Sequence, residues 1–180
     1  MNKTQKIQSY FESLENKRYE LFEELDKINS QTLNLKPQPD KWSIIQVMYH
    51  LIESEKLSVI YIKRKISNES LLENSNIKSK INAFALKWGL NLPLKFKAPA
   101  NVSNVPDFDT FENVKLKWDK VRNSFSSIIN NTSTEVLTKN IFQHPIVGRM
   151  NMIGTIEFFD SHFKHHRKQI KVLLTKLNSE

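Results

Sequence analysis

The stretch DTFENVKLKWDKVRNSFSSII, residues 109–129, decides the fold class. Its apolar residues recur at strict three- and four-residue spacing, which is the period of one buried face of an α-helix. A seam this regular is typical of helices that pack against one another in a bundle. Asp109, with Glu112 three residues later, marks the start of this helix. The seam consists of Phe111, Val114, Trp118, Val121, Phe125 and Ile128.

Three other segments show the same amphipathic period. The first runs over residues 4–28 and the last over residues 151–177. Between them, residues 43–66 form a second predicted helix, which opens with Ser43 and Gln46 at the spacing of a capping box. Together with the helix that begins near Asp109, these segments predict four long helices.

The connections between the helices are polar and rich in proline. Residues 29–40 and 67–109 are predicted loops, and the second is long, with a short helix expected at about residues 77–88. A connection of that length lets the second and third helices run in the same direction. We therefore predict an all-α protein, a four-helix bundle of up-down-down-up topology with a long crossover between helices 2 and 3. A short segment at residues 134–137 and a loop around Pro145 and Gly148 precede the last helix.

Length and composition restrict the other possibilities. A chain of 180 residues with 39% hydrophobic and 26% charged residues is expected to fold as one domain, residues 1–180. It has no cysteine, so a metal ion would have to bind through His, Asp or Glu. No apolar leader or membrane span is visible, and a cytoplasmic location is expected. The net charge of +8 could suit an anionic partner, but the lysines are scattered, so nucleic acid is not the favoured partner.

Three histidines are candidates for a metal site. His162 and His166 are four residues apart and therefore lie on one face of the last helix, one turn apart. That row continues through Phe159, which directs it toward the interior of the bundle. His50 lies at the border of the apolar stripe of the second helix. Three imidazoles and one water are the usual ligands of a catalytic zinc ion. Two alternatives remain open. His162 and His166 could be a pair at the rim near a helix terminus that favours charged histidine, and His50 could be a core or boundary histidine with its hydrogen bonds satisfied.

Two longer motifs carry a resemblance to a known family. The string KWSIIQVMYHLIESE, residues 41–55, resembles the start of the second helix in the DinB/YfiT-like superfamily, and FQHPIVGRMNMIGTIEFFDSHFKHHRKQI, residues 142–170, resembles its closing block. The resemblance implies a four-helix bundle, frequently dimeric, with a nickel or zinc site made by three histidines. Carried over by position, those ligands are His50, His162 and His166.

Other residues near these motifs receive secondary interpretations. Glu53 is the chosen candidate for a general base beside a metal-bound water, although Glu55 is also near in sequence. His165 is interpreted as an outer or surface residue, and His144 as a residue that packs or caps a loop. Gln169 lies close to the row of His162, so it could orient an imidazole or a bound water, or it could be solvated.

The resemblance also implies a set of activities: metal-dependent hydrolysis, thiol S-transfer and thiol-dependent maleylpyruvate isomerisation. We therefore expect a divalent-metal-dependent enzyme, a hydrolase or a low-molecular-weight-thiol S-transferase, that acts on a small electrophilic substrate. Because the chain has no cysteine, the thiol would be a cosubstrate. A homodimer is expected from the same resemblance. The alternative is a stress-associated metal-binding or interaction protein without turnover.

Overall fold

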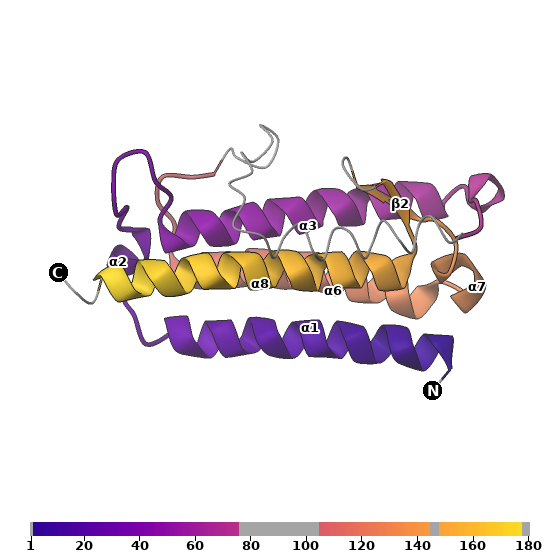
Figure 1. Ribbon diagram of the computed structural model, residues 1–180, viewed down its shortest axis with the longest axis horizontal. Coiled ribbons are helices and arrows are strands. Elements are labelled where there is room, and N and C mark those ends of the chain that lie inside the picture. The colour runs from indigo at the N-terminus through magenta and orange to yellow at the C-terminus, as the bar shows by residue number, and fades with distance from the viewer. Residues whose placement is uncertain (1, 76–104, 145–147, 178–180) are drawn as a thin grey trace.

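Four long helices form the body of the molecule, and their directions define its topology. The computed structural model describes residues 2–75, 105–144 and 148–177. In Figure 1 the colour gradient runs one way along α3 and α6 and the other way along α1 and α8. The predicted all-α, up-down-down-up bundle is therefore confirmed in the described residues. The long helices are α1 (Lys3–Leu25), α3 (Ile44–Ile66), α6 (Phe111–Asn131) and α8 (Met152–Leu177).

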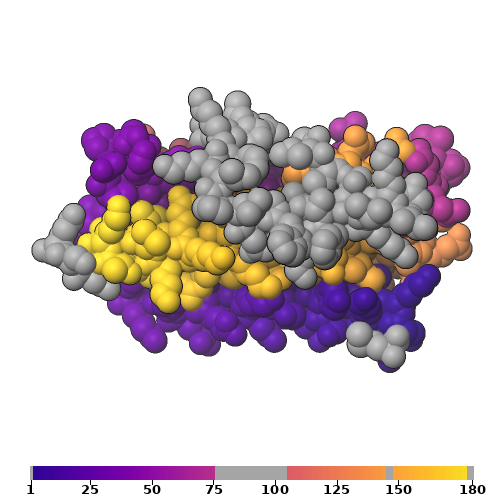
Figure 2. Space-filling view, viewed as in Figure 1, coloured from indigo at the N-terminus to yellow at the C-terminus, as the bar shows by residue number. Residues whose placement is uncertain are grey.

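Helices α1 and α8 are parallel neighbours. Lys17 donates a hydrogen bond of 2.5 Å to Asp160. Seven residues further along both helices, Arg167 donates a hydrogen bond to Glu24. Both residue numbers rise together, which is the signature of a parallel pair. The two helices lie side by side along the face shown in Figure 2, where α8 is yellow and α1 is indigo.

Helices α3 and α6 form the second parallel pair. Tyr49 contacts Lys117 near the start of both helices, and Glu55 contacts Arg122 further along. Parallel neighbours need a connection that returns along the bundle, and residues 67–110 supply the length for it. The short helix predicted at residues 77–88 lies outside the described residues.

The start of α3 is capped as its sequence predicts. The Ser43 hydroxyl accepts a hydrogen bond from the Gln46 backbone N–H, and the Gln46 side chain accepts one from the Ser43 N–H, so the capping box is confirmed. Gln46 also donates through Nε2 to the carbonyl of Pro106, at 3.1 Å. The cap therefore fixes the first turn of α3 and also holds the segment that leads into α6.

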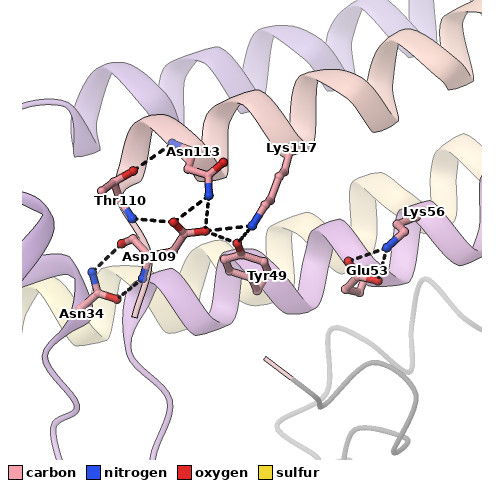
Figure 3. A network of polar contacts seen from close by, with 8 residues as sticks. All are labelled: Asn34, Tyr49, Glu53, Lys56, Asp109, Thr110, Asn113 and Lys117. Atoms are coloured by element: carbon pink, nitrogen blue, oxygen red, sulfur yellow. Dashed lines mark hydrogen bonds and ion pairs between the residues drawn. The ribbon is translucent and has the colours of Figure 1, made fainter. Parts of the chain in front are cut away.

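The predicted start of α6 near Asp109 needs a small correction. The N-cap is Thr110, whose hydroxyl accepts from the N–H of Asn113, and the helix begins at Phe111. The Asp109 carboxylate instead accepts hydrogen bonds from Tyr49, Asn113 and Lys117 (Figure 3). Asp109 thus links the start of α6 to α3 and is not the N-cap of α6.

Two short elements were not predicted from the sequence. The first helix ends at Leu25 instead of residue 28, and the polar run after it contains α2 (Ser30–Asn34), capped by Asn29. The loop before α8 contains an antiparallel hairpin of β1 (Phe142–His144) and β2 (Gly148–Met150). Both elements are too short to give a periodic signal, and contacts with the bundle stabilise them. The segments η1 (Glu69–Leu71) and α7 (Thr134–Leu137) complete the described elements.

A buried ionic cluster lies within the otherwise apolar core. Arg122 of α6 donates to both oxygens of the Glu55 carboxylate and, through Nη1, to Glu15 of α1. Arg18, which like Arg122 is only 1% exposed, donates to the same Glu15, and the Trp118 indole donates to Glu55. These contacts require α1, α3 and α6 to pack against one another at fixed positions along their axes. Among the described residues, no helix combines the length with the apolar character that crossing a membrane requires.

Candidate metal centre

Helix α8 places two of the predicted ligands on its buried face. His162 and His166 are each 8% exposed, and their Nε2 atoms lie 3.1 Å apart. The row predicted from the sequence is correct, because Phe159 and Thr155, one and two turns earlier, are also buried. The two imidazoles therefore face the interior, and the alternative of an exposed pair at the rim is wrong.

Helix α3 brings the third imidazole to the same point. His50 is 6% exposed, and its Nε2 lies 3.1 Å from Nε2 of His162. One ligand atom from each of His50, His162 and His166 lies within 4.8 Å of the others. Two residues distant in sequence by more than a hundred positions thus meet in space because α3 and α8 pack against each other.

The spacing of these nitrogen atoms fits a small divalent cation. For zinc–nitrogen bonds of 2.0–2.1 Å in a tetrahedral arrangement, two ligand nitrogens are about 3.3 Å apart. Nε2 of His162 is 3.1 Å from Nε2 of each of the other two histidines. A neutral imidazole carries only one N–H, so three converging Nε2 atoms present lone pairs to one another unless a cation or protons lie between them.

Gln169 determines which nitrogen of His166 carries the proton. Its side-chain oxygen Oε1 lies 2.8 Å from Nδ1 of His166. An amide oxygen only accepts, so Nδ1 of His166 must be the donor and its Nε2 is left with a lone pair. This is the orientation that a metal ligand needs, and it matches the interpretation of Gln169 as a residue that orients an imidazole.

Burial keeps His162 and His166 neutral. Desolvation, followed by the charges of the neighbouring histidines, holds the pKa of His162 well below its usual range. Desolvation and the charge of His50 lower the pKa of His166 to about 3, although the hydrogen bond with Gln169 acts in the opposite direction. The neutral imidazole is the form that binds a metal ion. At neutral pH, His162 and His166 can therefore bind a metal without first losing a proton.

Two aromatic side chains border the three histidines. The ring of Phe158 stacks on His162 with centroids 5.6 Å apart and an angle of 10°, and Trp42 lies 5.3 Å from His50. Phe158 could have been found from the sequence, because it lies one turn before His162 on the same face. Trp42 precedes α3, and only the fold brings it to His50.

The structure separates the remaining candidates. Glu53 makes an ion pair with Lys56, with both carboxylate oxygens 3.0 Å from Nζ, and it is not part of the three-histidine group. Glu55 is also outside the three-histidine group, and its carboxylate accepts hydrogen bonds from Arg122 in the buried ionic cluster. His165 is half-buried and its ring centroid lies 4.9 Å from that of His166, so it is an outer neighbour as predicted.

The chain is similar to a known family and to several known proteins. The family model described as the DinB superfamily matches residues 13–170. The YuaE protein of Bacillus subtilis is 25% identical over 160 residues, which cover 89% of this chain and 94% of that protein. A Bacillus cereus protein named "Putative metal-dependent hydrolase" is 24% identical over 172 residues, covering 96% of this chain and 87% of that protein.

Two solved structures share the fold. YfiT from Bacillus subtilis, described as a probable metal-dependent hydrolase with an unusual four-helix bundle topology, matches with a TM-score of 0.61 at 14% identity, over 96% of this chain and 87% of that one. A conserved protein from Enterococcus faecalis matches with a TM-score of 0.62 at 14% identity, over 96% of this chain and 97% of that one. The family match spans both motifs that carry the three histidines, and on this basis the chain belongs to the DinB superfamily.

Proposed function

We propose that His50, His162 and His166 bind one divalent metal ion, zinc or nickel, and that the protein is a metal-dependent hydrolase of a small electrophilic substrate. The observation that carries this proposal is the convergence of three buried Nε2 atoms, with His162 at 3.1 Å from both partners. The name of the Bacillus cereus relative and the description of YfiT support the same class of reaction.

Three protein ligands suit catalysis better than a purely structural role. Structural zinc sites in proteins are usually closed by four protein ligands, whereas catalytic sites keep one position for water or substrate. Within the described residues, the group contains three histidines and no fourth side chain. A divalent metal bound there would supply a water of lowered pKa or would polarise a carbonyl group of the substrate.

Glu53 is the proposed general base. It follows His50 by three residues and therefore projects within about 60° of it around the α3 axis. Its carboxylate pairs with Lys56 at a half-buried position on that helix. A carboxylate placed near a metal-bound water is the group that would accept its proton. In the competing interpretation, Glu53 and Lys56 form a solvated ion pair without a role in catalysis. The variant Glu53→Gln distinguishes these two interpretations. A base predicts loss of turnover with unchanged metal content, whereas a solvated pair predicts no change in either.

Thiol transfer is the second candidate reaction. The full sequence contains no cysteine, so the protein itself provides no thiol that could occupy the metal or be modified by the electrophile. A low-molecular-weight thiol could then serve as a cosubstrate that a metal activates. A third possibility is a metal-binding protein without turnover.

The experiment compares the metal content of tag-free protein with that of His50→Ala, His162→Ala and His166→Ala. His165→Ala is the matched control, because this histidine lies on the same helix beside the site but outside the group. We expect about one metal ion per chain in the parent and the control, and loss of metal in the three ligand variants with the fold retained by circular dichroism. A parent that stays metal-free after loading with zinc or nickel contradicts the proposal. Metal-loaded protein is then screened for ester hydrolysis with and without an added small thiol.

A further inference from the structure

The indole ring of Trp42 is a direct neighbour of His50, the ligand that α3 contributes. The centroids of the two rings are 5.3 Å apart, and their planes are tilted by 40°. The imidazole of His50 also contacts the rings of His162 and His166, with centroids at 5.1 and 4.7 Å. Of these three neighbouring rings, that of Trp42 is the one that does not belong to a proposed ligand.

The orientation of a histidine ligand is not fixed by its own torsions. The outer torsion of histidine, χ2, has a broad and roughly twofold profile, so the ring can turn over at little cost. A half-turn about χ2 puts the carbon atom Cε1 where Nε2 was, and a carbon atom cannot bind a metal ion. Contacts from outside the ligand set are therefore needed to keep Nε2 directed at the metal.

Both ligands on α8 have such a contact. Oε1 of Gln169 lies 2.8 Å from Nδ1 of His166. The ring of Phe158 is stacked on His162, and it also contacts His144 of β1, with centroids 4.8 Å apart. The indole next to the ligand of α3 is in the corresponding place, because it borders an imidazole without being part of the three-histidine group.

Trp42 is itself held in position. It directly precedes Ser43, the fully buried N-cap of α3, whose capping box with Gln46 fixes the backbone there. The indole is half-buried and packs against the apolar core of the bundle. Tryptophan is large and has only two side-chain torsions, so little conformational entropy is lost when its ring is held. The indole can therefore act as a fixed flat surface for a neighbouring ring.

We propose that Trp42 is a positioning residue, whose indole holds the His50 imidazole in the orientation that presents Nε2 to the metal. This inference rests on the metal centre proposed above. It implies that Trp42 raises the metal affinity without contacting the metal. It also implies that a flat ring is required at this position, and that apolar volume alone does not replace it.

The test compares two substitutions of Trp42 with a matched control. Trp42→Met fills the space with a flexible apolar chain, whereas Trp42→Phe keeps a flat ring. Tyr61→Met is the control, because Tyr61 is a half-buried aromatic residue of α3 whose ring contacts Phe142, at 5.9 Å. Zinc affinity is measured by competition with a chromophoric chelator. The visible spectrum of the cobalt(II)-loaded protein reports the coordination, and circular dichroism and urea unfolding report the fold and its stability.

We expect Trp42→Met to bind zinc about tenfold more weakly than the parent, which is the usual effect of losing an outer partner of a ligand. Its cobalt spectrum should differ from that of the parent, because His50 is no longer held as a ligand. Trp42→Phe should recover most of the affinity and the parent spectrum, and Tyr61→Met should match the parent in both. A merely structural role of Trp42 predicts lower stability with unchanged affinity and spectrum.

Several outcomes overturn the inference. Equal zinc affinity and equal cobalt spectra in Trp42→Met and the parent overturn it and leave the three-histidine site intact. Equal losses in Trp42→Met and Tyr61→Met also overturn it, since the cause would then be a general loosening of α3. So does a Trp42→Phe variant that binds no better than Trp42→Met, because a flat ring would then not matter. If Trp42→Met does not fold, Trp42→Leu replaces it with the same expected results. A parent that binds neither zinc nor cobalt refutes the proposed metal centre, and the inference falls with it.

Discussion

Oε1 of Gln169 lies 2.8 Å from Nδ1 of His166, one turn further along α8. The contact holds the imidazole in the tautomer whose Nε2 faces His50 and His162. Outer partners of this kind orient metal-binding histidines and raise their basicity. Gln169 is therefore expected to influence metal affinity without touching the metal.

Replacing Gln169 by leucine should weaken zinc binding by about 10- to 100-fold, because His166 loses the acceptor that fixes its tautomer. Gln169→Glu should retain the affinity, since a carboxylate accepts the same hydrogen bond. Competition with a chromophoric chelator measures the affinity, and ¹⁵N NMR of the imidazoles reports the tautomer. Gln143→Leu, at an exposed position of the hairpin, is the control. Equal affinities in Gln169→Leu and Gln143→Leu would contradict the role given to Gln169.

The Asp109 network should make the bundle sensitive to acid. Burial alone would raise the pKa of Asp109, but hydrogen bonds from Tyr49, Asn113 and Lys117 outweigh it and lower the pKa to about 2. A pKa lower in the folded state than its usual value of 3.8 stabilises the fold above about pH 4. The contribution is lost as the pH falls toward 2, because the unfolded chain then binds the proton more readily.

We therefore expect Asp109→Asn to lower the free energy of unfolding at pH 7 by about 1 kcal/mol, a discounted value because Lys117 is 42% exposed. The difference from the parent should shrink between pH 4 and pH 2. Urea titrations at several pH values measure it. Asp107→Asn removes a carboxylate that is 92% exposed and pairs with Lys36, so it should change stability little. A difference between Asp109→Asn and the parent that stays constant with pH would speak against the lowered pKa.

The buried pair of Glu55 and Arg122 should be costly to break. Arg122→Met leaves the Glu55 carboxylate buried with the Trp118 indole as its one remaining side-chain donor among the described residues, and an uncompensated buried charge costs about 3–5 kcal/mol. Arg149→Met is the matched control, because Arg149 pairs with Glu73 at half-exposed positions. Its removal should cost less than about 1 kcal/mol. Chemical denaturation measures both variants, and similar losses in the two would contradict the role of burial.

Metal-free protein should lose stability in mildly acidic solution. The lowered pKa values of His162 and His166 mean that the unfolded chain binds protons first as the pH falls below about 6.5. Each of these histidines should then cost about 1 kcal/mol of stability per pH unit between pH 6.5 and 4.5. Urea unfolding with a chelator present measures the slope. The double variant His162→Phe and His166→Phe should flatten the slope, and a flat profile in the parent would refute the prediction.

The sequence alone determined the long helices and the face on which two ligands lie, because both depend on local periodicity. The seam from Phe111 to Ile128, the capping box of Ser43 with Gln46, and the pairing of His162 with His166 each involve residues within a few turns. His50 was a candidate from its place at the border of the apolar stripe of its helix, and the resemblance implied that it is the third ligand. Periodicity failed for α2 and the hairpin, which span too few residues for a repeat.

Only the tertiary structure decided which distant groups meet. The arrival of His50 at His162, the aromatic walls of Phe158 and Trp42, and the position of His144 depend on how α3, α8 and the hairpin pack. Asp109 illustrates the difference: its sequence suggested a helix cap, but the packing of α3 against α6 offered it Tyr49 and Lys117. Contacts between segments far apart in the chain have no local pattern, since they result from the burial of whole helix faces against one another.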